Sequence, residues 1–174
     1  GGTLRVYGSP TAPVSGAISW LDASTLGLNQ GDAVSQVLDR SASQNNFVPY
    51  NGSNVPTFNA NSLNGLGTIH FNGGDQGLVT QANVGISGGQ SRSMFAVMKR
   101  DDGGDMFINM GTVDFYQSYG IFSQDDNFLA PCVVGWGNAE TGAPQAANQF
   151  EIYGALHQHV GNDGAHYGYV NGTL

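Results

Sequence analysis

The sequence is poor in basic residues. Only 5 Lys or Arg residues stand against 13 Asp or Glu residues, and the net charge at pH 7 is −8. This balance excludes a nucleic-acid partner, because nucleic-acid binding depends on basic side chains that neutralise phosphates. An anionic membrane surface would also repel the chain. We therefore expect neither nucleic acid nor an anionic membrane surface among its partners.

Cysteine and long apolar runs are also lacking. Cys132 is the only cysteine, so the chain can form no internal disulfide and no zinc site built on several cysteines. Cys132 lies in the apolar run 131–136, and we interpret it as a buried, unreactive thiol. No apolar run approaches the roughly 18 residues of a membrane-spanning helix, so we expect no membrane insertion.

Charged residues make up only 10% of the chain, against about 25% in typical domains. Lys99 is the single lysine and Glu occurs only twice, so strong helix-forming residues other than Leu and Ala are scarce. Six of the 27 glycines follow Asn or Asp, and such pairs adopt the positive φ angles of tight hairpin turns. These pairs occupy positions 51–52, 64–65, 72–73, 102–103, 163–164 and 171–172. The composition indicates one all-β domain.

Short apolar or alternating segments between these turns predict strands. They are 17–21, 68–71, 77–80, 93–99, 105–110, 119–123, 131–136, 149–157 and 166–170. Segments 93–99 and 105–110 flank the acidic turn DDGG, which predicts a hairpin. Segment 32–38 has apolar residues at helical spacing behind Asp32, but it also fits a strand. Frequent short strands and turns indicate an antiparallel β-sandwich.

Several stretches together resemble LamG-like jelly-roll domains of the concanavalin A-like lectin/glucanase superfamily. The matching residues are Trp20, Leu21, Asp22 and Ala23, then Asp39 and Ser41, then Pro56, Phe58, Leu63, Asn64, Gly65, Ile69, Phe71, Asn72 and Gly73, and finally Tyr169, Val170, Asn171 and Gly172. Val37 stands where the family often has Trp. The resemblance implies two antiparallel sheets packed as a jelly roll over residues 17–174, with residues 1–16 as an N-terminal arm or edge strand.

In that family, further strands usually follow the Tyr-Val-Asn-Gly hairpin. The resemblance therefore implies that the final strands are absent from this sequence. An unpaired sandwich edge favours aggregation. We expect that the native polypeptide is longer, that another chain supplies the strands, or that the N-terminal segment 3–8 replaces one.

The acidic residues do not form the pattern of a glycosidase. Retaining hydrolysis needs two carboxyl groups about 5–5.5 Å apart. Glu140 and Glu151 are eleven positions apart, and neither has an acidic neighbour two positions away. The segments 157–159 (HQH) and 167–169 (YGY) match the resembling polysaccharide lyases only superficially. We therefore expect no enzymatic activity, with a glycan-active hydrolase or lyase as a second alternative.

One region has the composition of a sugar-binding site, which combines aromatic faces with Asn, Asp and Gly groups. Its residues are Tyr116, Tyr119, Asp125, Asp126, Asn127, Trp136 and Asn138. Trp136 lies between two glycines, so its ring is predicted to be reachable from a loop. The alternative is a core tryptophan that closes one end of the sandwich.

Calcium is the metal for which the sequence offers ligands. Asp101, Asp102 and Asp105 cluster in the segment RDDGGD, and the resemblance implies that calcium binds at the rim of the fold. The alternative is that these residues are ordinary turn residues. His157 and His159 would share one face of a strand, either as a metal pair without a visible third ligand or as part of a solvated face.

These features predict a non-catalytic recognition or adhesion module of a larger extracellular protein, exposed on a surface and binding a glycan. The first alternative is a structural subunit of a virion, fibre or appendage surface, whose partners are neighbouring protein subunits in an assembly or homo-oligomer. The scarcity of lysine favours this alternative, and the aromatic, Asn-rich region favours glycan binding. We expect an extracellular, cell-surface or virion-surface location.

Overall fold

In the computed structural model, the described residues are 14–86, 90–101, 107–111, 118–124, 128–134, 143–144, 146–160 and 163–173. Eleven strands and one short 3-10 helix, η1 (Ala23–Thr25), lie in this part of the chain, and it contains no α-helix. All named strand pairings are antiparallel. The all-β prediction is confirmed. Contacts divide the chain into two compact units, unit 1 (1–85) and unit 2 (86–174). The expected boundary at residue 16 and the single domain after it stay predictions.

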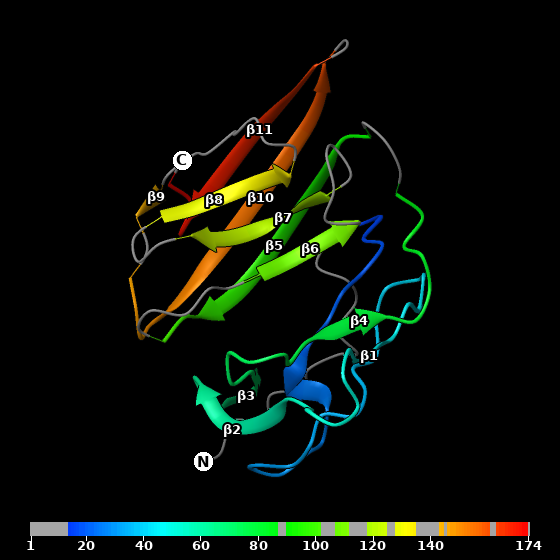
Figure 1. Cartoon of the computed structure of the whole chain (residues 1–174), viewed down its shortest axis with the longest axis vertical. Coiled ribbons are helices and arrows are strands. Elements are labelled where there is room, and N and C mark those ends of the chain that lie inside the picture. Colours follow the sequence, from blue (N-terminus) through cyan, green and yellow to red (C-terminus); the bar gives the residue numbers. More distant parts are fainter. Residues whose placement is uncertain are drawn as a thin grey trace, which may run out of the picture. The chain divides into compact units, whose positions relative to one another are not determined.

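Unit 1 holds two small antiparallel sheets (Figure 1). In one, β1 (Phe47–Pro49) pairs with β4 (Leu78–Thr80), and in the other, β2 (Thr57–Leu63) pairs with β3 (Leu66–His70). The turn between β2 and β3 is the predicted Asn64-Gly65 pair, with φ angles of 50° and 83°. A two-residue hairpin turn requires this left-handed backbone. Local turn chemistry therefore determines this hairpin.

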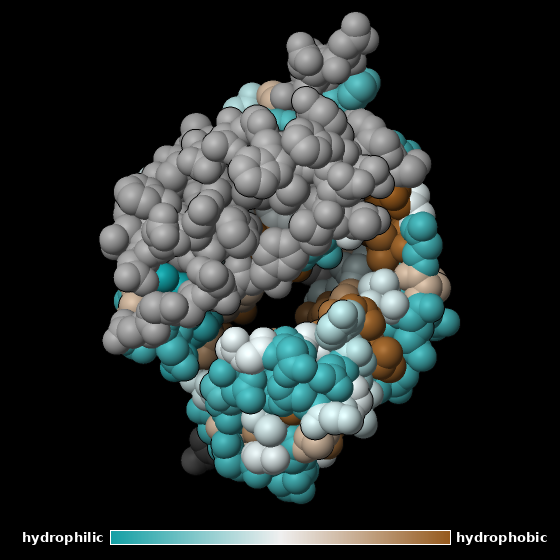
Figure 2. Space-filling model, in the orientation of Figure 1, coloured by the Kyte–Doolittle hydropathy of each residue, from teal (hydrophilic) through white to brown (hydrophobic). Residues whose placement is uncertain are grey.

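The core of unit 1 is centred on Val34, Val37 and Phe58. The Phe58 ring lies so close to Gly67 on β3 that a Cβ atom at position 67 would be 2.1 Å from the ring. A side chain at that position would therefore displace the ring from the core. The surface over β2 is mostly hydrophilic or neutral, as Figure 2 shows.

Segment 32–38 is extended, so the helical alternative is wrong. Val34 and Val37 are buried as their spacing suggested, but Leu38 is 58% exposed. The segment forms only isolated bridges, Ala33 to Thr57 and Val37 to Phe47. Its backbone bonds with the chain on either side, as in the pair of 2.9 Å hydrogen bonds between Val37 and Phe47. These partners replace the internal bonds that a helix would have made.

The predicted strand 17–21 is not a strand. Trp20 donates its backbone N–H to Asp39 Oδ1 at 2.8 Å, and its carbonyl accepts from Arg40 N–H at 2.9 Å. The Arg40 guanidinium lies 5.2 Å from the centroid of the Trp20 ring, which is half-buried. Asp22 then caps η1 by accepting from Ser24 N–H. The Asp39 side chain and the backbone N–H of Arg40, rather than a neighbouring strand, thus bond to the backbone of Trp20.

Unit 2 contains two larger antiparallel sheets that share one core (Figure 1). One has the strand order β11-β10-β5 and the other β6-β7-β8-β9. The strands are β5 (Arg92–Lys99), β6 (Phe107–Gly111), β7 (Ser118–Gln124), β8 (Phe128–Val134), β9 (Ala143–Pro144), β10 (Phe150–Val160) and β11 (Asp163–Val170). The shared core contains Tyr119 and Ile121 of β7, Tyr153 and Ala155 of β10, and Val170 of β11. Unit 2 is compatible with the predicted sandwich, and the jelly-roll topology stays a prediction.

Eight of the nine predicted strands overlap observed ones, and only 17–21 does not. Strands β1, β2 and β9 were not predicted. The hairpin predicted from 93–99 and 105–110 is wrong, because β5 bonds to β10 whereas β6 bonds to β7. The chain between β5 and β6 therefore connects strands of different sheets. Alternation alone indicates a strand and does not identify its partner.

Candidate functional site

The loop after β1 and the loop before β4 lie side by side in unit 1. Pro49, at the end of β1, is opposite Leu78, at the start of β4. The next residue, Tyr50, continues the contact by donating its N–H to the carbonyl of Gly77 at 2.8 Å. The β1–β4 pairing thereby brings residues 50–55 against residues 72–77.

Asp75 is the centre of a polar cluster formed by these two loops. Its Oδ2 accepts from Asn51 Nδ2 at 2.6 Å, and its Oδ1 accepts from Asn54 Nδ2. Gln76 Nε2 donates to Asn54 Oδ1 at 3.1 Å and its Oε1 accepts from Asn72 N–H at 2.7 Å. We call Asn51, Asn54, Asn72, Asp75 and Gln76 the Asp75 cluster.

The cluster presents an ionised carboxylate to solvent. Asp75 is exposed, and hydrogen bonds from Asn54 and then from Asn51 lower the pKa of its carboxyl group below the ordinary value. These amides also hold the carboxylate in a defined orientation. An exposed group that is already oriented loses little conformational entropy when a ligand binds.

Tyr50 directly precedes Asn51 of this cluster, and it is 72% exposed. An aromatic ring offers a flat apolar surface, and the neighbouring amides and carboxylate offer donors and acceptors. A sugar ring has the matching properties, namely an apolar C–H face and a rim of hydroxyl groups. Tyr50 and the Asp75 cluster therefore form the candidate recognition site of unit 1.

Most of the predicted glycan-binding residues lie outside the described residues. These are Tyr116, Asp125, Asp126, Asn127, Trp136 and Asn138. Tyr119 is described and is only 3% exposed in the core of unit 2. Burial raises the pKa of its hydroxyl group well above the ordinary value. A binding face around these residues stays a prediction.

The predicted calcium ligands are also mostly outside the described part. Asp102 and Asp105 are among the residues that the structure does not describe. Asp101 is exposed, and its carboxylate lies 3.3 Å from Lys99 Nζ. Among the described residues, no three His, Cys, Asp or Glu side chains gather closely enough to hold a metal ion. The calcium site stays a prediction.

His157 is brought together with His166 rather than with His159. His157 and His166 are opposite residues of β10 and β11, and their Nδ1 atoms are 3.1 Å apart. The backbone N–H of His159 donates instead to Ser91 Oγ at 2.9 Å. The sequence showed two histidines on one strand but did not show which residue of the other strand would face them.

Glu151 is buried, at 4% exposure, and makes several hydrogen bonds. Its Oε2 accepts from Tyr153 Oη at 2.8 Å and from Ala146 N–H at 3.1 Å, and its Oε1 accepts from Asn171 Nδ2 at 3.2 Å. This carboxylate joins β10 to the segment before it and to the turn after β11, at one end of the sheet. Glu140 lies outside the described residues.

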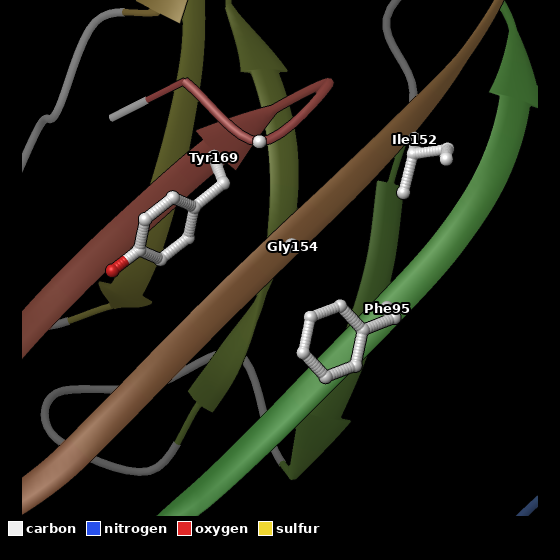
Figure 3. Close-up of a pocket in the computed structure, with 5 residues that line it drawn as sticks. Phe95, Ile152, Gly154 and Tyr169 are labelled. Atoms are coloured by element: carbon white, nitrogen blue, oxygen red, sulfur yellow. The ribbon is translucent and has the colours of Figure 1, made fainter. Parts of the chain in front are cut away.

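The outer face of the β11-β10-β5 sheet carries exposed apolar side chains. Phe95, Val97 and Ile152 are 70%, 56% and 55% exposed. A hollow of about 350 Å³ on this face is lined by Phe95, Ile152, Gly154, Tyr169 and Gly172. Figure 3 shows Phe95 and Tyr169 on the two strands that flank Gly154. The alternation of apolar and polar residues in β5 indicated that one face of this strand is exposed. It did not indicate which strands lie beside β5 in the sheet.

Sequence reasoning missed Tyr50 and the Asp75 cluster as a site. Asn51-Gly52 and Asn72-Gly73 were recognised only as turns. An aromatic residue directly before an Asn-Gly turn was the available signal. The contact between the two turns depends on the pairing of β1 with β4, which are separated by 28 residues of the chain.

Comparisons with protein-family models, with curated proteins and with solved structures find no match for this chain. The resemblance to LamG-like domains therefore stays a prediction. In the part of the chain that the structure describes, no helix has the length and apolar character needed to cross a membrane.

Proposed function

We propose that this chain is a non-catalytic recognition module that binds glycans and belongs to a larger extracellular or surface protein. The observation that carries the proposal is the exposed side chain of Tyr50, which directly precedes Asn51 of the hydrogen-bonded Asp75 cluster. The ring supports stacking of a sugar face, and the cluster supports hydrogen bonds to hydroxyl groups at its edge.

Charge narrows the class of glycan. Asp75 is ionised and exposed, and the whole chain carries a net charge of −8. Sialylated, sulfated or uronic-acid glycans would bring like charges together, which is unfavourable at close range. The site therefore favours neutral glycans rich in neighbouring hydroxyl groups.

A glycan array probed with and without calcium tests this function. We expect binding to neutral glycans that Tyr50→Ala weakens about tenfold, which corresponds to about 1.4 kcal/mol. Phe95→Ala is the matched control, because Phe95 is equally exposed but lies in unit 2. The proposal fails if no glycan binds, or if Tyr50→Ala and Phe95→Ala weaken binding alike. Binding that requires calcium would support the predicted site at Asp101, Asp102 and Asp105.

The apolar outer face of the β11-β10-β5 sheet favours the structural alternative, in which copies of the chain assemble. Phe95, Val97 and Ile152 form an exposed apolar patch on this face, as the cross-strand pairing of Val97 with Ile152 shows. Such patches commonly mark protein interfaces. Under this alternative the wild-type chain is oligomeric in size-exclusion chromatography and Phe95→Asp is monomeric. A monomeric wild-type chain at high concentration would contradict it.

A further inference from the structure

Two Asn-Gly turns of the chain have the same backbone shape. Asn64-Gly65 has φ angles of 50° and 83°, and Asn171-Gly172 has φ angles of 52° and 81°. Each is a two-residue turn whose flanking residues are paired antiparallel. Because the backbone shape does not distinguish the two asparagines, any difference in their reactivity must come from the contacts of their side chains.

Those side-chain contacts differ. Asn171 Oδ1 accepts from Ile152 N–H at 2.9 Å, and Asn171 Nδ2 donates to Glu151 Oε1 at 3.2 Å. Asn64 and Gly65 are exposed, and in the described part of the chain neither the Asn64 side chain nor the Gly65 N–H has a hydrogen-bond partner. The Asn64 amide can therefore rotate freely, whereas the Asn171 amide is held at both its oxygen and its nitrogen.

The other two Asn-Gly turns also hold their amides. Asn51 Nδ2 donates to Asp75 Oδ2 at 2.6 Å, and Asn51 Oδ1 accepts from Ser53 N–H at 3.0 Å. Asn72 Oδ1 accepts from Gly74 N–H at 3.1 Å. All four Asn-Gly pairs lie within the described ranges, and among them only Asn64-Gly65 has an asparagine side chain that no hydrogen bond holds.

We propose that Asn64 is a site of spontaneous deamidation, which converts it to an aspartyl or isoaspartyl residue. The Gly65 backbone nitrogen loses its proton and attacks Asn64 Cγ, the bond between Cγ and Nδ2 breaks, and ammonia leaves. Water then opens the cyclic imide at one of its two carbonyl carbons. A side chain that rotates freely brings Cγ to the attacking nitrogen more often than one that is held. The backbone must also leave its left-handed conformation, and this step is common to both turns.

Deamidation at position 64 changes the β2–β3 hairpin. An isoaspartyl residue carries the main chain through its Cβ atom, which adds one backbone atom to a two-residue turn. The pairing across that turn then loses its register, close to where the Phe58 ring lies against Gly67. Asn64 is not part of the Asp75 cluster, so this modification does not rest on glycan binding.

Incubation of the whole chain at mildly alkaline pH, followed by tandem mass spectrometry of proteolytic peptides, measures the conversion of each asparagine. We expect Asn64 to react at least about tenfold faster than Asn171, because the hydrogen bonds of Asn171 must break before the attack and raise its barrier. The same chain unfolded in urea is the control. There the folded contacts are lost, and Asn64 and Asn171 should react at similar rates, since glycine follows both.

Glu151→Ala provides a second test, because it removes the acceptor of Asn171 Nδ2. In the folded variant, Asn171 should react faster than in the wild type, and the rate at Asn64 should not change. If this variant does not fold, the comparison within the wild-type chain decides alone. The proposal is overturned if Asn171 reacts as fast as Asn64 in the folded wild type, or if Asn64 reacts only after urea unfolds the chain.

Discussion

The ring of Phe95 lies over Gly154, its opposite residue in the neighbouring strand (Figure 3). A Cβ atom at position 154 would be 3.2 Å from two carbons of that ring. Glycine within a strand is normally unfavourable, and a cross-strand aromatic ring compensates by covering the exposed backbone. The Phe95 ring thus covers the backbone at Gly154, and this contact compensates for a glycine inside the strand. Both residues line the hollow on the outer face of this sheet.

Two glycines of unit 2 should differ in how much their substitution by alanine changes stability. At Gly154 the obstacle is the exposed Phe95 ring, which can shift, so we expect a change in the free energy of unfolding of less than about 1 kcal/mol. At Gly120 a Cβ atom would lie 2.1 Å from the carbonyl oxygen of Ile108, which is backbone in the paired strand β6. We expect Gly120→Ala to destabilise the chain by about 1–3 kcal/mol or more. Urea unfolding of both variants measures the difference, and equal effects would contradict this account.

Stability should fall as the pH drops through the histidine range. The pKa of His166 is lowered in the folded chain by burial, by His157 and by Arg92, whereas an unfolded histidine titrates near 6.5. Below about pH 6.5 position 166 therefore binds more protons in the unfolded chain than in the folded one, and this group lowers the free energy of unfolding between about pH 7 and pH 5. Urea unfolding across this range measures the slope.

His166→Gln should reduce that slope, because it removes the group with the lowered pKa. His159→Gln is the control, and its slope should match that of the wild type. A wild-type slope that persists in His166→Gln would assign the effect to other groups.

Asp39 should be a strong determinant of stability in unit 1. It is 5% exposed and accepts hydrogen bonds from Trp20 N–H, Ser41 N–H, Ser41 Oγ and Asn45 N–H at 2.8–2.9 Å. Burial raises the pKa of its carboxyl group, but these hydrogen bonds outweigh burial and leave the pKa lowered. We expect Asp39→Ala to lower the free energy of unfolding by about 2–4 kcal/mol, since several donors lose a charged acceptor. The exposed Asp101 provides the control, and Asp101→Ala should change stability by less than about 0.5 kcal/mol.

Glu151→Gln should affect stability and leave glycan binding unchanged. The buried carboxylate accepts from Tyr153, Ala146 and Asn171, and the amide cannot accept at both of its terminal atoms. We expect a loss of about 1–3 kcal/mol in urea unfolding, with array binding unchanged. The hydrolase alternative predicts instead that the wild type cleaves glycans and that Glu151→Gln abolishes cleavage.

Several features that depend on neighbouring residues were predicted, although the pair Asp163-Gly164, predicted as a turn, is wrong because it begins strand β11. The Asn64-Gly65 turn and the alternation in β5 both follow from local backbone and side-chain preferences. The Asp39 and Ser41 pair, noticed as part of a family pattern, is a turn that Asp39 holds together. Asp39 and Ser41 are only two residues apart, so their contact does not depend on a distant strand.

Features that depend on strand partners were not predicted. The acidic turn suggested a hairpin between β5 and β6, but β5 lies beside β10, about 60 residues further along the chain. Segment 32–38 fitted both a helix and a strand, and bonds to Pro56 and Phe47 made it extended. Partner choice depends on which apolar faces are buried together, and no short stretch of sequence contains that information.

The sequence by itself determined the all-β class and the turns at Asn64-Gly65 and Asn171-Gly172, because these follow from composition and from short-range backbone preferences. Tertiary structure alone decided that Asn51 and Asn54 bond to Asp75 and that His157 faces His166. Each of these neighbourhoods depends on the register of an antiparallel pair, and a shift of one residue would turn every side chain to the other face. The candidate sites of this protein are therefore products of strand register.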